Sequence, residues 1–197
     1  MQRGTLEIIT GPMFAGKTTE LIRRQHRLNT IGRRILLVNH QSNTRHDASG
    51  QSIVSHDATR AQGSPVVVVR LLDSVRTQAS HRTLYHAAQI VMVDEAQFFE
   101  DLYSTVLRMV ERDGKHVVLS GLMADAQRNL FGDVHQLVHH ADSFTLLRAL
   151  CKQCGNGTPG IYTRKLRNVA QTIGGADLYE TLCRRHYCEV IRRDALE

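Results

Sequence analysis

The chain has few aromatic residues and no long apolar run. Among its 197 residues there is no Trp, aromatic residues make up 5%, and Pro occurs only three times. So few rings disfavour a surface on which successive nucleic-acid bases stack. No apolar stretch has the length of a membrane span, and the opening MQRGTLEIIT has no signal-peptide core. We therefore expect a cytoplasmic protein with no membrane partner.

Cysteine is absent from the first 150 residues, and all four cysteines lie in the last quarter of the chain. In a reducing compartment, short paired spacings favour metal binding over disulfides. The pairs Cys151-x-x-Cys154 and Cys183-x-x-His186 can meet on one tetrahedral Zn²⁺. Four protein ligands leave no open position, so the zinc is predicted to be structural. Cys188 is an alternative fourth ligand, although the tighter spacing favours His186.

The overall composition is that of a globular protein. Hydrophobic residues make up 42% and charged residues 22% of the chain, and the formal net charge is +6. The basic residues are scattered instead of massed in a tail. This balance suits anionic ligands without identifying them, and it favours a solvated basic surface over a nucleic-acid stripe.

Short apolar runs alternate with helical patterns through the first 150 residues. We predict strands at 6–10, 34–39, 66–71, 89–93, 116–120 and 144–150, and helices at 16–30 and 100–112. The polar stretch 41–62 is predicted to be a long connection. This alternation indicates an α/β fold of the P-loop NTPase type, with a mostly parallel sheet flanked by helices. Residues 1–150 are the predicted nucleotide-binding domain, and 151–197 a small zinc-binding lasso domain.

A phosphate-binding motif follows the first predicted strand. The segment GPMFAGKT, from Gly11 to Thr18, matches G-x-x-x-x-G-K-[ST] and leads into a predicted helix. Its glycines allow backbone N–H groups to approach a phosphate closely. Lys17 would neutralise the β- and γ-phosphates, and the Thr18 hydroxyl would bind Mg²⁺. The predicted ATP-phosphate residues are Gly11, Pro12, Met13, Phe14, Ala15, Gly16, Lys17, Thr18 and Thr19.

Two carboxylates end the predicted strand at 89–93. Asp94 and Glu95 lie where open α/β sheets bind their ligands, at the carboxyl end of a strand. Asp94 is predicted to lie beside the Mg²⁺ with Thr18. Glu95 is predicted to be the general base that accepts the proton of the attacking hydroxyl. The alternative is a Glu that orients a water for nucleotide hydrolysis, and local spacing does not separate the two.

Several motifs together resemble the cellular type II thymidine kinases nearly from end to end. They are GPMFAGKTTELIRR, DEAQFF, GLMADAQRNLFGDV, CKQCG, YTRKL and IGGADLYETLCRRH, in this order. The resemblance implies transfer of the γ-phosphate of ATP to the 5′-hydroxyl of thymidine, and also of deoxyuridine, giving dTMP in nucleotide salvage. It also implies Mg²⁺ with ATP, a structural Zn²⁺ that holds a lasso over the thymine, feedback inhibition by dTTP, and a homotetramer.

The same resemblance implies roles for individual residues. Glu95 would be the catalytic base, with Lys17 and Arg45 at the transferring phosphoryl group. The implied nucleoside-binding residues are Met13, Phe98, Leu122, Phe131, Thr163, Thr172, Gly174 and Tyr179. Two positions depart from the family pattern: Asn43 stands where relatives often have Asp near the metal, and Ala126 where they often have a Phe that stacks on the base. The metal role of position 43 and strict thymidine specificity are therefore open.

Two other classes of function compete with a nucleoside kinase. A zinc-ribbon P-loop ATPase acting on nucleic acid is supported mainly by the basic charge. A non-catalytic zinc-ribbon interaction module is disfavoured by the intact Lys17, Thr18, Asp94 and Glu95. The thymidine kinase activity, without a nucleic-acid partner, is the preferred hypothesis.

Overall fold

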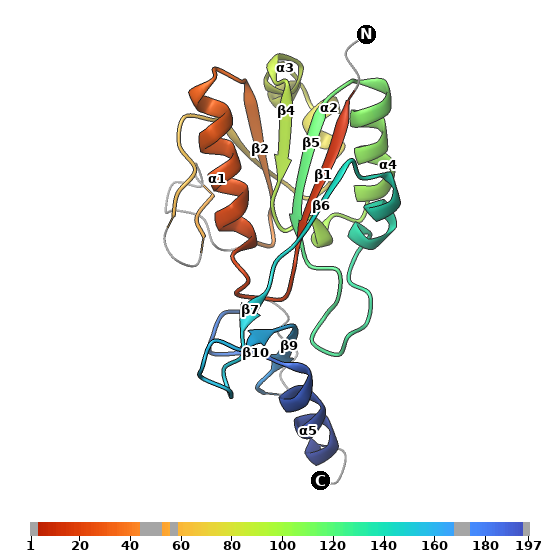
Figure 1. Cartoon of the computed structure of the whole chain (residues 1–197). Helices are drawn as coiled ribbons and strands as arrows, with labels where there is room; N and C mark the ends of the chain where they lie inside the picture. Colours follow the sequence, from red (N-terminus) through yellow and green to blue (C-terminus); the bar gives the residue numbers. More distant parts are fainter. Residues whose placement is uncertain (1–3, 44–52, 56–58, 168–173, 195–197) are drawn as a thin grey trace.

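A six-stranded parallel sheet forms the centre of the molecule (Figure 1). The computed structural model describes residues 4–43, 53–55, 59–167 and 174–194. The sheet contains β1 (Thr5–Thr10), β2 (Ile35–His40), β3 (Val66–Val69), β4 (Ile90–Val93), β5 (His116–Gly121) and β6 (Ser143–Leu146). The strand order is β3-β2-β4-β5-β1-β6, and every pairing is parallel. The predicted α/β fold with a mostly parallel sheet is thus confirmed.

Both faces of the sheet are buried, as the continuous apolar runs predict. Successive side chains of a strand point to opposite faces. On β2, Ile35 and Leu37 join one buried cluster, whereas Leu36 and Val38 join the other. Helix α1 (Lys17–Thr30) covers the face of Ile35 and Leu37, where it lies in front of the sheet in Figure 1. Helix α1 begins at Lys17, so the last two residues of the phosphate motif lie in its first turn.

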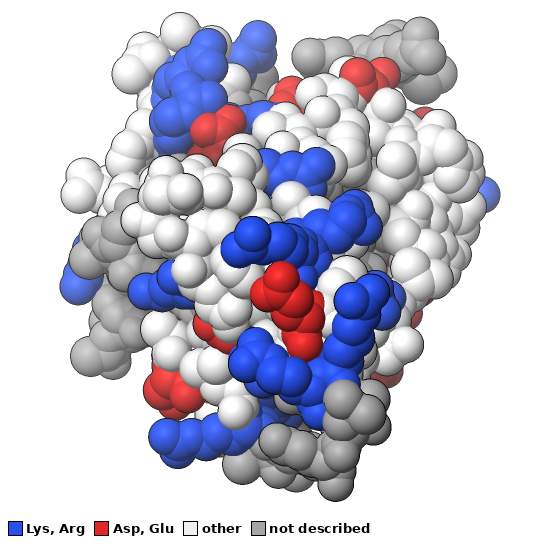
Figure 2. All heavy atoms as spheres, turned by 60° about the horizontal axis from the view of Figure 1, so that its bottom comes forward, with Lys and Arg blue, Asp and Glu red and all other residues white. Residues whose placement is uncertain are grey.

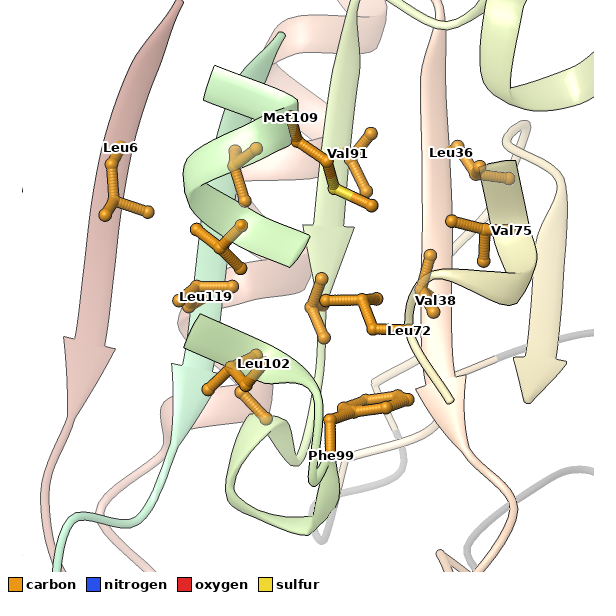
Figure 3. Close-up of a cluster of buried hydrophobic side chains, with 14 of the residues drawn as sticks. Leu6, Leu36, Val38, Leu72, Val75, Val91, Phe99, Leu102, Met109 and Leu119 are labelled. Atoms are coloured by element: carbon orange, nitrogen blue, oxygen red, sulfur yellow. The ribbon is translucent and has the colours of Figure 1, made fainter. Parts of the chain in front are cut away.

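The second face is covered by several short helices. They are α2 (Ser74–Thr77), α3 (Ala79–Ala87), α4 (Leu102–Leu107), the π-helical turn Arg108–Arg112 and the 3₁₀ helix Val134–His140. In this layer Met109 is directed toward Val91, and Leu102 lies beside Leu119 (Figure 3). The helix predicted at 100–112 therefore exists, but its last turn is wound more loosely than an α-helix.

The strand predicted at 144–150 is wrong as a single element. The chain forms β6 in the main sheet and then β7 (Ala149–Leu150), which pairs with β8 (Pro159–Gly160) in a separate two-stranded sheet. The break follows from the length of β1: Leu147 donates its N–H to the carbonyl of Thr10 at 2.7 Å, the last residue of β1. Beyond that bond the sheet offers no further partner, and the chain turns away.

The predicted connection at 41–62 contributes to the core within its described residues. Ile53 is buried among the side chains that α1 covers. Val54 forms an isolated antiparallel bridge with Arg60. Ala61 belongs to the same buried cluster, so two apolar residues anchor part of this polar connection.

The C-terminal part forms its own small unit below the sheet in Figure 1. Strands β9 (Tyr162–Lys165) and β10 (Tyr179–Leu182) make an antiparallel hairpin, followed by helix α5 (Arg184–Asp194). Its buried cluster consists of Cys151, Leu182, Tyr187 and Val190. Among the described residues, no helix has the length and apolar character to cross a membrane.

Candidate active site and metal cluster

The phosphate motif forms a tight loop between β1 and α1. Phe14 and Gly16 adopt positive φ angles of 59° and 79°. At Gly11, any Cβ atom would lie 2.5 Å from the carbonyl oxygen of Leu147, so only glycine fits there. Lys17 begins α1, and its Nζ donates to the carbonyl of Pro12 at 2.9 Å. The motif thus has the compact loop-to-helix conformation that a phosphate cradle requires.

Asp94 lies beside this loop at the carboxyl end of β4. The hydroxyl of Thr18 donates to its two carboxylate oxygens at 3.2 and 3.0 Å, and the hydroxyl of Ser120 donates at 2.8 Å. Burial, and then the nearby Glu95, raise the pKa of Asp94 to about 6, against the lowering effect of the two hydroxyl hydrogen bonds. The two residues predicted to flank Mg²⁺ are therefore in direct contact.

Ser120 is a neighbour of this carboxylate that the motifs did not identify. It lies near the end of β5 and is almost fully buried. Because the carboxyl ends of parallel strands share one edge of the sheet, its position after an apolar run could have indicated it.

Glu95 is held by the side chain of Gln97. The residue itself has a left-handed backbone, with φ 50° and ψ 44°. Gln97 donates Nε2–H to the carboxylate of Glu95 at 2.6 Å, and its Oε1 accepts the N–H of Leu122 at 2.9 Å. Since the N–H of Leu122 can only donate, the oxygen of the amide must face it and the nitrogen must face Glu95. Glu95 is thereby tied to the loop that begins at Leu122.

A pocket of about 200 Å³ opens next to these groups. It is lined by Met13, Leu122, Ala124, Asp125, Ala126, Gln127, Phe131, Thr163, Lys165 and Tyr179. Five of the eight predicted nucleoside-binding residues are in this set, namely Met13, Leu122, Phe131, Thr163 and Tyr179. Met13 donates its N–H to the hydroxyl of Thr163 at 3.0 Å, so the phosphate loop and β9 meet at this pocket.

Two further predicted nucleoside residues, Phe98 and Gly174, do not line this pocket. Phe98 packs edge-on against Phe131, with ring centroids 5.5 Å apart, and so supports a pocket residue. Gly174 packs on Leu178, where an added Cβ would approach a side-chain carbon to 2.4 Å. Arg45 and Thr172 lie outside the described residues.

The two departures from the family pattern have different surroundings. Asn43 is buried, and its side-chain amide donates to the side chain of Asn39 at 3.1 Å. Ala126 lines the pocket, as its family position implies. The polar lining residues Asp125, Gln127 and Lys165 were not anticipated from the motifs. For Asp125 and Gln127, the position after the strand end at Gly121 is the sequence signal that could have indicated them, whereas Lys165 lies on β9 of the C-terminal unit.

Three cysteines and one histidine converge in the C-terminal unit. The Nδ1 atom of His186 lies 3.4, 3.4 and 3.5 Å from the Sγ atoms of Cys151, Cys154 and Cys183, and the last two Sγ atoms are 3.8 Å apart. Tetrahedral zinc with ordinary bond lengths holds such atoms about 3.5–3.8 Å apart. The cluster therefore has the dimensions of a zinc site, and Cys188 does not belong to it.

The surface around this unit is basic but interrupted. Figure 2 views the molecule with the bottom of Figure 1 turned forward, and on this face Lys and Arg side chains are interleaved with acidic ones. Arg164 pairs with Glu180 at 3.0 Å, and Arg185 with Glu189 at 3.6 Å. These pairs break the continuity that a nucleic-acid stripe requires.

The parallel sheet, the loop after β1 and the buried acid at the end of β4 define a P-loop nucleotide-binding protein. The family model described as thymidine kinase matches residues 4–187. Similar proteins include a thymidine kinase of Oryza sativa, 37% identical over 94% of this chain and 67% of the relative. A cytosolic thymidine kinase of Gallus gallus is 34% identical over 94% of this chain and 77% of the relative. A thymidine kinase of Bacteroides thetaiotaomicron is 35% identical over 94% of this chain and 88% of the relative. The chain belongs to the thymidine kinase family, which confirms the resemblance seen in its motifs.

Proposed function

We propose that the chain transfers the γ-phosphate of ATP to the 5′-hydroxyl of thymidine, and also accepts deoxyuridine, giving dTMP in nucleotide salvage. The observation that carries this proposal is the position of Met13. This residue belongs to the phosphate loop and also lines the pocket, where its N–H is bonded to Thr163. A nucleoside in the pocket would therefore have its hydroxyl close to a triphosphate in the loop.

The triphosphate would be bound by the loop residues 11–19. Backbone N–H groups of the loop and the N-terminus of α1 supply partial positive charge, and Lys17 supplies a full charge. Arg45 is proposed to reach the transferring phosphoryl group, in keeping with its place in the family pattern.

Mg²⁺ would be held by Thr18 and Asp94. A hydroxyl and a carboxylate are the hard oxygen ligands that this ion prefers, and a buried carboxylate with a raised pKa gains most from a neighbouring cation. Bound Mg²⁺ would neutralise charge on the phosphate oxygens. Ser120 would keep Asp94 oriented through its 2.8 Å hydrogen bond.

Glu95 is proposed to accept the proton of the attacking 5′-hydroxyl. Its neighbours support this role: Asp94 precedes it beside the metal position, and Gln97 holds its carboxylate toward the loop at Leu122. A carboxylate held in one orientation is an effective base late in phosphoryl transfer, when the hydroxyl becomes acidic.

The nucleoside would be bound by Met13, Phe98, Leu122, Phe131, Thr163, Thr172, Gly174 and Tyr179. The covering segment would be anchored by structural Zn²⁺ on Cys151, Cys154, Cys183 and His186, in a domain formed by residues 151–197. Two features support a separate C-terminal unit: among the described residues, β7 to β10 pair only with one another, and their apolar cluster is separate from the main core. Its first strand, β7, begins at Ala149, two residues before the proposed boundary.

We further propose a cytoplasmic homotetramer inhibited by dTTP. Assembly is supported by the edge strand β6, whose Phe144 and Leu146 remain 42% and 47% exposed. An exposed edge with apolar side chains is a favourable surface for another subunit. Inhibition by dTTP is supported by family membership, because the product of the salvage route would share both the base pocket and the phosphate loop.

The decisive experiment incubates the protein with labelled ATP, Mg²⁺ and each natural deoxynucleoside in turn. The proposal expects a labelled monophosphate from thymidine and deoxyuridine, with little from purine deoxynucleosides. ADP formation without any labelled nucleotide product would instead identify a hydrolase. Stimulation of that hydrolysis by DNA, lost steeply with added salt, would favour the nucleic-acid ATPase.

A further inference from the structure

The segment between Leu122 and Phe131 forms one wall of the pocket, and we call it the pocket loop. Its tip is folded by Asp125, whose Oδ1 accepts the N–H groups of Gln127 and Asn129 at 2.9 and 2.8 Å. These bonds determine the local shape of the turn. They do not determine how far the turn lies from the opposite wall, which is built from β9 and β10.

One side chain outside the main domain contacts the pocket loop twice. The hydroxyl of Tyr187 donates to the carbonyl of Ala126 at 2.9 Å. The guanidinium of Arg128 lies 5.2 Å from the centroid of the Tyr187 ring, within the range of a cation–π contact. Ala126 lines the pocket, so the hydrogen bond ends on the backbone of a pocket residue.

Tyr187 is itself held firmly. It is 1% exposed and packs with Cys151, Leu182 and Val190, and its ring centroid lies 4.7 Å from that of Tyr162. The preceding residue, His186, belongs to the Cys₃His cluster. The position of the phenol is therefore set by the same packing that forms the proposed zinc site.

We propose that Tyr187 is a positioning residue for nucleoside binding, which holds the pocket loop at the correct distance from β9 and β10. The inference rests on the proposed function, because it concerns the same pocket. It gives the C-terminal unit a second role. Besides anchoring the covering segment, this unit sets the width of the pocket from the other side through its helix α5.

Loss of the hydroxyl has a specific expected effect. The carbonyl of Ala126 would lose its donor, and the pocket loop could shift away from the nucleoside. Within the described residues, the hydrogen bond and ring contacts of Tyr187 go to Ala126, Arg128 and Tyr162, and none of these belongs to the phosphate loop. Nucleoside affinity should therefore fall while ATP affinity stays the same.

The test compares Tyr187→Phe with Tyr162→Phe. Both variants remove one phenolic hydroxyl from the same part of the C-terminal unit and keep the ring. The hydroxyl of Tyr162 accepts from the exposed Arg184 at 2.5 Å, within the C-terminal unit and not on the pocket loop, so this variant is a matched control. Zinc content, KM for thymidine, KM for ATP and calorimetric thymidine binding are measured for both variants and for the unaltered chain.

The expected result is a rise of about five- to tenfold in the KM and Kd for thymidine in Tyr187→Phe. Its KM for ATP and its zinc content should be unchanged, and Tyr162→Phe should stay within about twofold of the unaltered chain in every measurement. Amide hydrogen exchange at 124–130 should become faster only in Tyr187→Phe, since that variant alone frees the loop.

Three outcomes would overturn the inference: unchanged thymidine affinity in Tyr187→Phe, an equal rise of both KM values, or loss of zinc from this variant. An unaltered chain that neither binds nor phosphorylates thymidine would instead refute the proposed function. The two failures are thus distinguished by the behaviour of the unaltered chain.

Discussion

Gln97 donates its side-chain amide to the carboxylate of Glu95 at 2.6 Å while its carbonyl oxygen accepts the N–H of Leu122. Gln97 is 4% exposed, so water offers the amide little competition. The consequence is that the proposed base has a fixed orientation that depends on a residue two positions away.

Gln97→Met should therefore impair the chemical step more than binding. Met has a similar volume but cannot donate to Glu95, so the carboxylate loses its orientation. We expect kcat to fall roughly 10- to 100-fold with the KM for ATP nearly unchanged. Gln136→Met is a suitable control, because Gln136 is an exposed residue whose amide donates to Asp133 and not to Glu95. A large rise in the KM for ATP with constant kcat would contradict the positioning role.

Glu95→Gln should remove the transfer itself. The amide keeps the size of the side chain but cannot accept the proton of the 5′-hydroxyl, so we expect kcat to fall about 10²- to 10⁴-fold. ATP binding, followed by calorimetry, should persist because the phosphate loop is intact. Glu100→Gln, at an exposed position, should leave the rate unchanged. Substantial turnover in Glu95→Gln would exclude this residue as the base.

Asp94→Asn should stabilise the protein without Mg²⁺ while abolishing Mg²⁺-dependent transfer. Burial holds the pKa of Asp94 at about 6, above the ordinary 3.8, so its ionised form destabilises the fold at neutral pH. The raised pKa means that ionising Asp94 costs more free energy in the folded state than in the unfolded state. Asn avoids this charge, and the hydroxyls of Thr18 and Ser120 can rotate to accept from its amide.

The pH dependence of this effect has a definite sign. At pH 8 the Asp94 carboxylate is charged in both the folded and the unfolded state, so the unaltered chain is destabilised by the full amount. As the pH falls through 6 toward 3.8, Asp94 takes up its proton first in the folded state. The difference in the free energy of unfolding between Asp94→Asn and the unaltered chain then disappears. Denaturant unfolding without Mg²⁺ at pH 8 and pH 5 measures this. An Asp94→Asn protein that is less stable than the unaltered chain at pH 8 would contradict the prediction.

The sequence predicted those parts of the site that are formed by one continuous segment of the chain. The phosphate loop follows from its glycines and its Lys17, and Asp94 follows from its place at the end of an apolar strand. The place of Ser120 after an apolar run is a weaker signal of the same kind. The bond from Gln97 to Leu122 and the bond from Tyr187 to Ala126, by contrast, require knowledge of which segments pack together. No local pattern contains that information.

The fold was predictable to a similar degree. The inner strands are long apolar runs, and their order along the chain is clear. Helices α2 and α3 had no such signal, because each buries a single residue, Val75 or Tyr85. The end of β6 was also hidden, since β6 and β7 are separated by only two residues and the break depends on where β1 ends.

Cys151→Ser should release zinc, whereas Cys188→Ser should retain it. The Sγ of Cys151 lies 3.4 Å from Nδ1 of His186, inside the cluster, and Cys188 lies outside it on the same helix as His186. Serine is a poor zinc ligand, and a structural zinc site contributes directly to folding. Metal content measured by atomic absorption should therefore fall in the first variant alone.

Loss of zinc should also weaken nucleoside binding in the pocket. Thr163 and Tyr179 lie on β9 and β10, which pack with the cluster in the C-terminal unit, whereas the phosphate loop lies in the main domain. Thymidine affinity should fall at least about tenfold in Cys151→Ser, and ATP binding should persist. Full zinc content in Cys151→Ser, or zinc loss from Cys188→Ser, would show that the Cys₃His cluster is not the metal site. Zinc loss with unchanged thymidine affinity would show that nucleoside binding does not depend on the metal.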